Sequence, residues 1–228
     1  MSEDRSPNTR AEGGAPSRDA ARAAFIARVT AGATHELRNF LAIVKESAGL
    51  IGDLVQAAGP GRAANPEKVE WALERIRLQV RRGTDLTDSL NRVMHGLDHP
   101  TEPVALGNAI EHATLLAQRF ARRSQCQIRD EEGAALTVSV NALDLYMALM
   151  TVMEWCVGRL PEGGEVVARP EAREGRPAVR FATDPAGAAL ADLEGDRRGL
   201  DAAADPLPAS IEVAGESIFL VFTVEEGI

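Results

Sequence analysis

The sequence predicts an α+β multidomain protein, with a helical hairpin in its N-terminal part and an α/β sandwich in its C-terminal part. Between about residues 17 and 95, apolar residues recur every three or four positions, the spacing of one buried stripe on a helix. After a proline-containing stretch at residues 99–103, short runs of alternating apolar residues lie between helical patterns. This second pattern is typical of strands and helices that share one domain.

Composition narrows the classes of partner. The chain has 228 residues, enough for two small domains, and 45% of them are hydrophobic, as in globular proteins. Its net charge of -9 argues against a general nucleic-acid binder and against an anionic membrane surface. No apolar run has the length of a membrane span or a signal peptide, so we expect a cytoplasmic protein without membrane contact. Cys126 and Cys156 lie far apart within apolar patterns, where neither a disulfide nor a metal site is expected.

The hairpin follows from local start and stop signals. Residues 1–16 are rich in Ser, Gly, Pro and charged side chains, which predicts a tail without a core. Ser17 is a suitable N-cap for a first helix that reaches about Ala58, and Asn65 with Pro66 begins a second helix that reaches about His95. The short connection makes the helices antiparallel neighbours. Because one hairpin has only a narrow seam to bury, we expect two copies to form a four-helix bundle, and hence a homodimer.

The sequence is therefore divided into a tail (1–16), a hairpin (17–98), a linker (99–103) and an α/β domain (104–228). In this last domain, Asn108 and Glu111 have the spacing of a capping box, and Asn141 is a suitable N-cap with an acid three residues later. No helix is expected after Gly199, because a short proline-broken stretch follows it. His112 is expected at the surface. The predicted strands cover 104–106, 125–129, 136–140, 165–169, 178–182, 210–213 and 218–224, and the predicted helices cover 108–123 and 141–160.

The first helix contains the stretch Thr34-His35-Glu36-Leu37-Arg38-Asn39-Phe40-Leu41. Its apolar stripe runs from Phe25 to Val55 through Ala33, Leu37 and Leu41, and His35 falls outside this stripe. A histidine on the exposed face of a bundle helix can act as a nucleophile. The stretch resembles the H-box of two-component histidine kinases and phosphotransferases, His-Glu-Leu-Arg-Asn-Pro-Leu. Phe40 stands where that family has proline, so the helix is expected to be less bent.

The resemblance implies a role for each polar residue of this stretch. His35 would accept a phosphoryl group, and Glu36 would accept a hydrogen bond from its ring and act as a base. Asn39, one turn further, would orient water for removal of phosphate from a partner's aspartate. Arg28 and Arg38 would form a positive rim for the phosphate. For each of these residues, His35 included, a solvated surface side chain is the alternative interpretation.

The order of elements in the C-terminal part resembles the ATP-binding domain of histidine kinases, the Bergerat-type α/β sandwich, in a degenerate form. The family's N-box carries two asparagines four residues apart, and Thr151 and Trp155 occupy those positions here. Neither can replace a carboxamide as a ligand for Mg²⁺ or phosphate. Asp184 matches the aspartate of the next box but lacks its glycines, and only Gly199-Leu200 remains of the second glycine box. ATP is therefore not expected as a cofactor.

The combination resembles the ChpT-type histidine phosphotransferases. It implies a His-Asp phosphotransferase that moves phosphate between aspartates of response-regulator receiver domains, with Mg²⁺ supplied by the receiver. Three alternatives stay open. The chain is an ATP-dependent histidine kinase with a divergent nucleotide site, a non-catalytic adaptor of a response regulator, or a phosphatase that uses Glu36 and Asn39.

Overall fold

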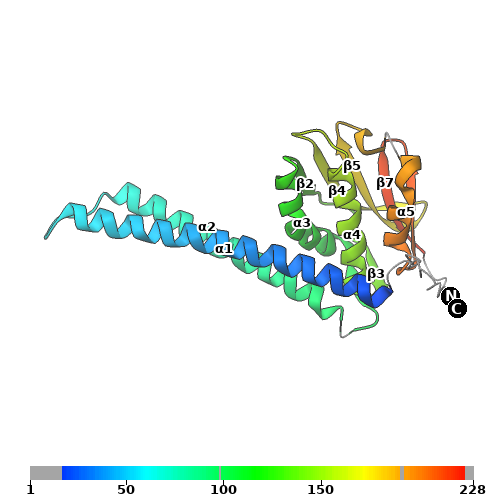
Figure 1. Ribbon diagram of the computed structural model, residues 1–228, viewed down its shortest axis with the longest axis horizontal. Coiled ribbons are helices and arrows are strands. Elements are labelled where there is room, and N and C mark those ends of the chain that lie inside the picture. Colours follow the sequence, from blue (N-terminus) through cyan, green and yellow to red (C-terminus); the bar gives the residue numbers. More distant parts are fainter. Residues whose placement is uncertain (1–16, 98, 191–192, 224–228) are drawn as a thin grey trace, which may run out of the picture.

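A computed structural model describes residues 17–97, 99–190 and 193–223. The predicted tail, residue 98 and the end of the predicted last strand at Val224 lie outside these ranges. The chain has the predicted α+β architecture, in which a long helical hairpin extends from an α/β body (Figure 1). Over the described residues, no helix combines the length and the apolar character that crossing a bilayer requires.

The hairpin consists of α1 (Arg18–Ala58) and α2 (Pro66–His95). Both predicted N-caps are confirmed: Ser17 Oγ accepts a hydrogen bond from the Ala20 amide, and Asn65 Oδ1 accepts one from the Lys68 amide. α1 ends at Gly59, whose φ of 78° is a conformation that favours glycine. The boundaries of the hairpin are thus set by local side-chain and backbone chemistry.

The apolar stripe of α1 is buried only along its first half. Phe25, Val29 and Ala33 are buried against the body, whereas Leu41 and Val55 are 66% and 58% exposed. The prediction of one continuous buried stripe is therefore wrong for the single chain. The distal half of the hairpin has only its own partner helix to pack against, so its outward seam stays uncovered.

The α/β body contains two sheets. The strands are β1 (Glu102–Ala105), β2 (Gln127–Asp130), β3 (Thr137–Val140), β4 (Glu165–Arg173), β5 (Arg176–Asp184), β6 (Ala209–Ala214) and β7 (Ser217–Phe222). β1 and β3 form an antiparallel pair, and the other strands form a sheet in the order β2-β4-β5-β7-β6. Only the β2–β4 pair in that sheet is parallel.

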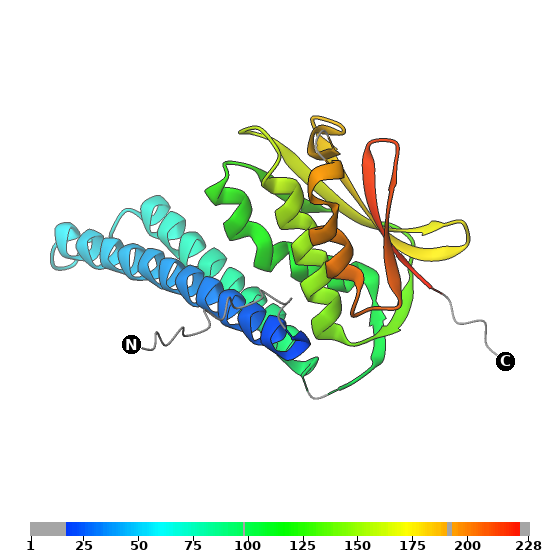
Figure 2. The same ribbon diagram turned by 45° about the vertical axis from the view of Figure 1, so that its right-hand side comes forward.

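Three helices, α3 (Leu106–Arg123), α4 (Ala142–Val157) and α5 (Leu193–Ala204), cover one face of the larger sheet (Figure 2). A short 3-10 helix, η1 (Ala188–Leu190), follows β5. The hairpin base packs against α3 and α4 on the side away from the sheet. Phe25 and Val93 of the hairpin consequently share one continuous core with Leu149 of α4 and Phe181 of the sheet.

Three expectations for the body are corrected. α3 begins at Leu106 with Ala105 as an N-cap that makes no side-chain hydrogen bond, so Asn108 is not the cap. The start is instead set by a tertiary contact, since the Leu106 amide donates to the Leu136 carbonyl. Second, β4 and β5 are longer than the predicted strands 165–169 and 178–182, and they continue through Pro170 and Pro177 to a tight turn at Gly175.

The third correction concerns α5, which occupies a segment where no helix was expected. The helix ends at Ala204, before the first proline, and therefore does not have to accommodate it. Leu200 and Ala204 are buried in the main core, and this burial stabilises a helix of modest intrinsic length.

Candidate active site

His35 lies on the exposed face of α1, near the middle of the helix. Its side chain is 57% exposed, while Ala33 is buried and Leu37 is half-buried. The helical period separates these neighbours, because residues two apart point to different sides of a helix. The ring is consequently held by a rigid element and remains open to a partner.

Asn39 lies one helical turn beyond His35, and its Nδ2 is 3.3 Å from His35 Nδ1. In this orientation the amide donates to Nδ1, and the ring proton of neutral imidazole is on Nε2. Rotation of the carboxamide by half a turn presents Oδ1 instead, which accepts a hydrogen bond from Nδ1–H and leaves the Nε2 lone pair free. Asn39 can therefore select the tautomer of His35 in addition to any role toward water.

Glu36 lies between His35 and the body. Its Oε1 is 4.0 Å from His35 Nδ1, and its Oε2 accepts a hydrogen bond of 2.5 Å from Arg122 Nη2 of α3. The Glu36 side chain is only 15% exposed. A carboxylate held at one oxygen by a cation keeps its second oxygen in a restricted region near the imidazole.

Arg122 is a site residue that the sequence did not reveal. It lies in the last turn of α3, where basic residues are common because they interact favourably with the helix dipole. Its contact with Glu36 joins residues 86 positions apart. No local pattern contains that information, since the contact depends on how the hairpin packs on the body.

The two predicted arginines differ in their surroundings. Arg28 forms an ion pair with Glu154 of α4, and its guanidinium lies 5.4 Å from the ring centroid of Phe120. Arg38 is exposed and has no ion-pair partner among the described residues. Of the two, Arg38 is the one whose positive charge is free to meet an incoming anion.

Further ion pairs fix the hairpin base to α4. Arg22 binds Asp144 through two hydrogen bonds, Nε–Oδ1 at 2.9 Å and Nη2–Oδ2 at 2.8 Å, and Arg18 binds the same carboxylate. The Asp144 side chain is fully buried. Burial by itself raises the pKa of Asp144, but hydrogen bonds from Arg22 and Arg18 outweigh it, so the pKa lies below its ordinary value. The carboxylate is therefore ionised and paired at neutral pH.

For Glu154, burial outweighs the ion pair, so its pKa shifts in the opposite direction to that of Asp144. Burial is the dominant influence and raises the pKa of Glu154, and the Arg28 charge opposes this shift only in part. The Arg28–Glu154 pair consequently contributes less to holding the hairpin than the Asp144 pairs do.

The positions that match the nucleotide boxes lie on α4 and around it. Thr151 is half-buried, and Trp155 is 8% exposed, with its indole N–H buried and without a hydrogen-bond partner among the residues that the structure describes. The guanidinium of Arg159 lies 3.8 Å from the centroid of the Trp155 ring and covers it. The second N-box position is thus occupied by the indole of Trp155, which the guanidinium of Arg159 covers. In the described part of the chain, no three His, Cys, Asp or Glu side chains are grouped in a way that could hold a metal ion.

No protein-family model and no curated protein matches the chain. Among solved structures, the chain is similar to a bacterial phosphotransferase, with 15% identity and a TM-score of 0.46 over 87% of this chain and 96% of that one. It is also similar to the Acinetobacter baumannii histidine kinase AdeS, with 13% identity and a TM-score of 0.41 over 82% of this chain and 95% of that one. The chain is likewise similar to the cytoplasmic segment of the histidine kinase QseC, with 15% identity and a TM-score of 0.42 over 64% of this chain and 95% of that one.

Proposed function

We propose that this protein is a histidine phosphotransferase of a two-component phosphorelay, which moves phosphate between receiver-domain aspartates through His35 without using ATP. The observation that carries the proposal is the 57% exposed imidazole of His35, with Asn39 at 3.3 Å and Glu36 at 4.0 Å from its Nδ1.

The transfer step needs little protein chemistry beyond positioning. The Nε2 lone pair of neutral His35 attacks the phosphorus of an aspartyl phosphate, a P–N bond forms, and the P–O bond to the aspartate breaks. The leaving carboxylate takes the electron pair of that bond. Asn39 or Glu36 accepts a hydrogen bond from Nδ1–H and stabilises the positive charge that develops on the ring. Attack by a second aspartate on the phosphohistidine reverses these steps.

The proposal assigns no role to ATP in this chain. Trp155 and Thr151 supply no carboxamide oxygen for Mg²⁺, and Trp155 and Arg159 fill space beside α4. Mg²⁺ would come with the acidic pocket of the receiver domain. Arg38, exposed beside His35, provides a positive charge that favours the approach of such an acidic partner.

The experiment combines the purified protein with phosphorylated receiver domains and, separately, with labelled ATP. We expect label on the protein that is lost in acid and absent in His35→Gln, followed by transfer to a second receiver. ATP alone should give no label. Labelling by ATP would show an active kinase, and a protein that binds receivers but takes no label would be an adaptor. Release of inorganic phosphate without a labelled intermediate would indicate a phosphatase.

A further inference from the structure

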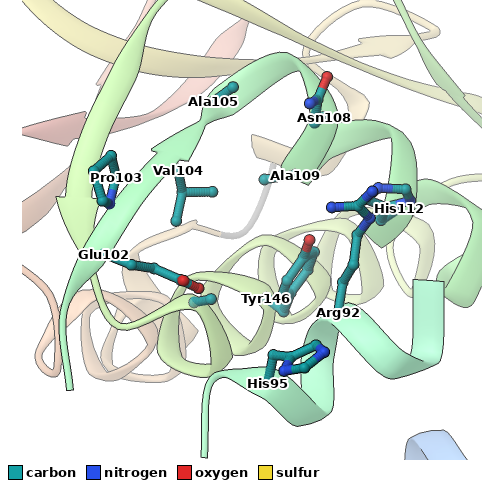
Figure 3. Close-up of a pocket in the computed structure, with 11 residues that line it drawn as sticks. Arg92, His95, Glu102, Pro103, Val104, Ala105, Asn108, Ala109, His112 and Tyr146 are labelled. Atoms are coloured by element: carbon teal, nitrogen blue, oxygen red, sulfur yellow. The ribbon is translucent and has the colours of Figure 1, made fainter. Parts of the chain in front are cut away.

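A polar cavity lies at the N-terminal end of α3, opposite the end that carries Arg122, where α2, β1, α3 and α4 meet. Its volume is about 340 Å³, within the range of small-molecule pockets. α3 is about 27 Å long, since its 18 residues rise about 1.5 Å each, so this cavity is remote from Arg122 and the His35 site. Arg92, Asn108, His112 and Tyr146 are among its lining residues, and the side chains of Arg92 and Tyr146 are directed into it (Figure 3).

Tyr146 has a hydroxyl without a partner in this cavity. The residue is 3% exposed, and its hydroxyl makes no hydrogen bond to any described residue. Figure 3 shows the hydroxyl directed into the cavity, toward Ala109 and Arg92. Burial raises the pKa of Tyr146 to about 12, so the group keeps its proton and can only gain from an acceptor. Because the hydroxyl opens onto the cavity and is not sealed from solvent, water can reach it in the free protein, and a bound acceptor can take the place of that water.

Arg92 provides the positive charge. It lines the cavity from α2 and has no ion-pair partner among the described residues, unlike the arginines at the hairpin base. The N-terminus of α3 faces the same space. Because its N-cap is Ala105, which makes no side-chain hydrogen bond, the amide of Asn108, a residue that lines the cavity, is left without a side-chain acceptor. Free amides and the positive end of a helix dipole attract an oxyanion.

The remaining polar groups refine the ligand. His112, expected at the surface, is half-buried, and its Nδ1 lies 3.1 Å from Ser89 Oγ. Burial and the nearby Arg92 lower the pKa of His112, so it is neutral and adds no charge. Glu102 and His95 line the other end of the cavity. A half-buried carboxylate at that end repels a second anionic group and accepts a hydrogen bond from a hydroxyl.

We infer that this cavity binds a small organic oxyanion, with its phosphate or carboxylate between Arg92, Tyr146 and the α3 N-terminus and a hydroxyl toward Glu102. Such a ligand contacts α2 on one side and α3 and α4 on the other. Its binding therefore stabilises the junction between hairpin and body.

The test is calorimetric titration of the full chain with glycerol 3-phosphate and with lactate at matched ionic strength. These probes separate a phosphate head group from a carboxylate. We expect binding of at least one, with Kd raised about tenfold or more by Arg92→Gln and about fivefold by Tyr146→Phe. Arg82→Gln, an exposed arginine of the same helix, should leave Kd unchanged.

Tyr146→Phe also guards against a folding artefact. Because the hydroxyl has no partner in the free protein, this variant should melt at the wild-type temperature without probe and gain less than the wild type with probe. The inference is overturned if neither probe binds at millimolar concentration. It is also overturned if binding is equal in wild type, Arg92→Gln and Tyr146→Phe, since the anion would then be held elsewhere.

Discussion

The two carboxylate oxygens of Glu36 face different partners, and this division decides what the residue can do. Oε2 is held by Arg122 at 2.5 Å, and Oε1 is left 4.0 Å from the imidazole of His35. A free glutamate on a helix surface would sample several rotamers and spend little time near its neighbour. Under the proposed function, we expect Arg122 to be a positioning residue that acts on His35 through Glu36.

Replacement of Arg122 by Gln is expected to slow phosphoryl transfer about tenfold, because Glu36 loses the contact that restrains it. The measurement is the rate at which a phosphorylated receiver labels the protein. Stability should change little, since an exposed ion pair contributes about 0–1 kcal/mol. Arg123→Gln, the next residue on α3 and also exposed, is the control and should transfer at the wild-type rate.

If Arg122 were only structural, Arg122→Gln would lower the free energy of unfolding and the transfer rate together, and Arg122→Lys would not restore the transfer rate. A positioning role instead predicts partial restoration of the rate by Arg122→Lys. If transfer by Arg122→Gln equals that of the wild type, Glu36 does not need the restraint, and the positioning role is wrong.

The first residues of the helices show which features of secondary structure the sequence can and cannot predict. Ser17, Asn65 and Asn141 were identified as N-caps, and each accepts a hydrogen bond from the amide three residues later. These caps are local, so the sequence contains them. α3 instead begins where β1 meets β3, at Leu106, and that start depends on strand pairing between distant segments.

α5 was missed for a related reason. Its sequence contains Gly199 and precedes two prolines, and judged alone it has little tendency to form a helix. Burial of Leu200 against the main core outweighs that deficit. The His35 site divides in the same way: His35, Glu36 and Asn39 follow from one helical turn, whereas Arg122 depends on packing between α1 and α3.

The pairing of α1 with α4 through Asp144 makes a prediction about stability and pH. In the folded state the pKa of Asp144 is lowered, so the carboxylate contributes stability above its unfolded pKa of about 3.9, and this contribution is lost as pH falls below that value. Asp144→Asn should therefore reduce the free energy of unfolding by about 2 kcal/mol at pH 7, because Arg18 and Arg22 lose their partner. The loss is limited because both arginines are partly exposed and can be solvated.

Denaturant unfolding of wild type and Asp144→Asn between pH 7 and pH 3 checks this. The difference between the two proteins should shrink steadily below about pH 4. Asp53→Asn, an exposed acid of the distal hairpin, should show no comparable difference at any pH. A difference for Asp144→Asn that is constant over the whole range would mean that its effect is steric and not electrostatic.

At the scale of the whole molecule, the hairpin has two different halves. The base is enclosed by the body and shares its core, while the distal half exposes apolar side chains on both helices: Leu41 and Val55 of α1, and Trp71, Leu78 and Val80 of α2. Leu37, Phe40 and Val80 line an apolar groove of about 390 Å³ between the helices. Such a surface is unusual for a monomer and is suited to the seam of a second hairpin.

We therefore expect the protein to be a homodimer at micromolar concentration, with a mass about twice the 24.3 kDa of one chain. Leu41→Lys combined with Val80→Lys places two charges in the seam, and the dissociation constant should rise about a hundredfold or more. Sedimentation velocity measures this directly. Leu97→Lys removes a 53% exposed apolar residue at the hairpin base, away from the groove, and should leave the dimer intact.

The dimer and the site are separable in this design. Leu41 belongs to the same stretch as His35, but the six-residue spacing places the two on different sides of α1. Monomeric Leu41→Lys/Val80→Lys protein should therefore keep the contacts of His35 with Asn39 and Glu36. We expect it to accept phosphate from a receiver, with any loss of rate due to a weaker docking surface and not to the chemistry. If the wild type sediments as a monomer, or if Leu97→Lys dissociates the protein as strongly as the double variant, the apolar seam is not the dimer interface and the exposed groove needs a different partner.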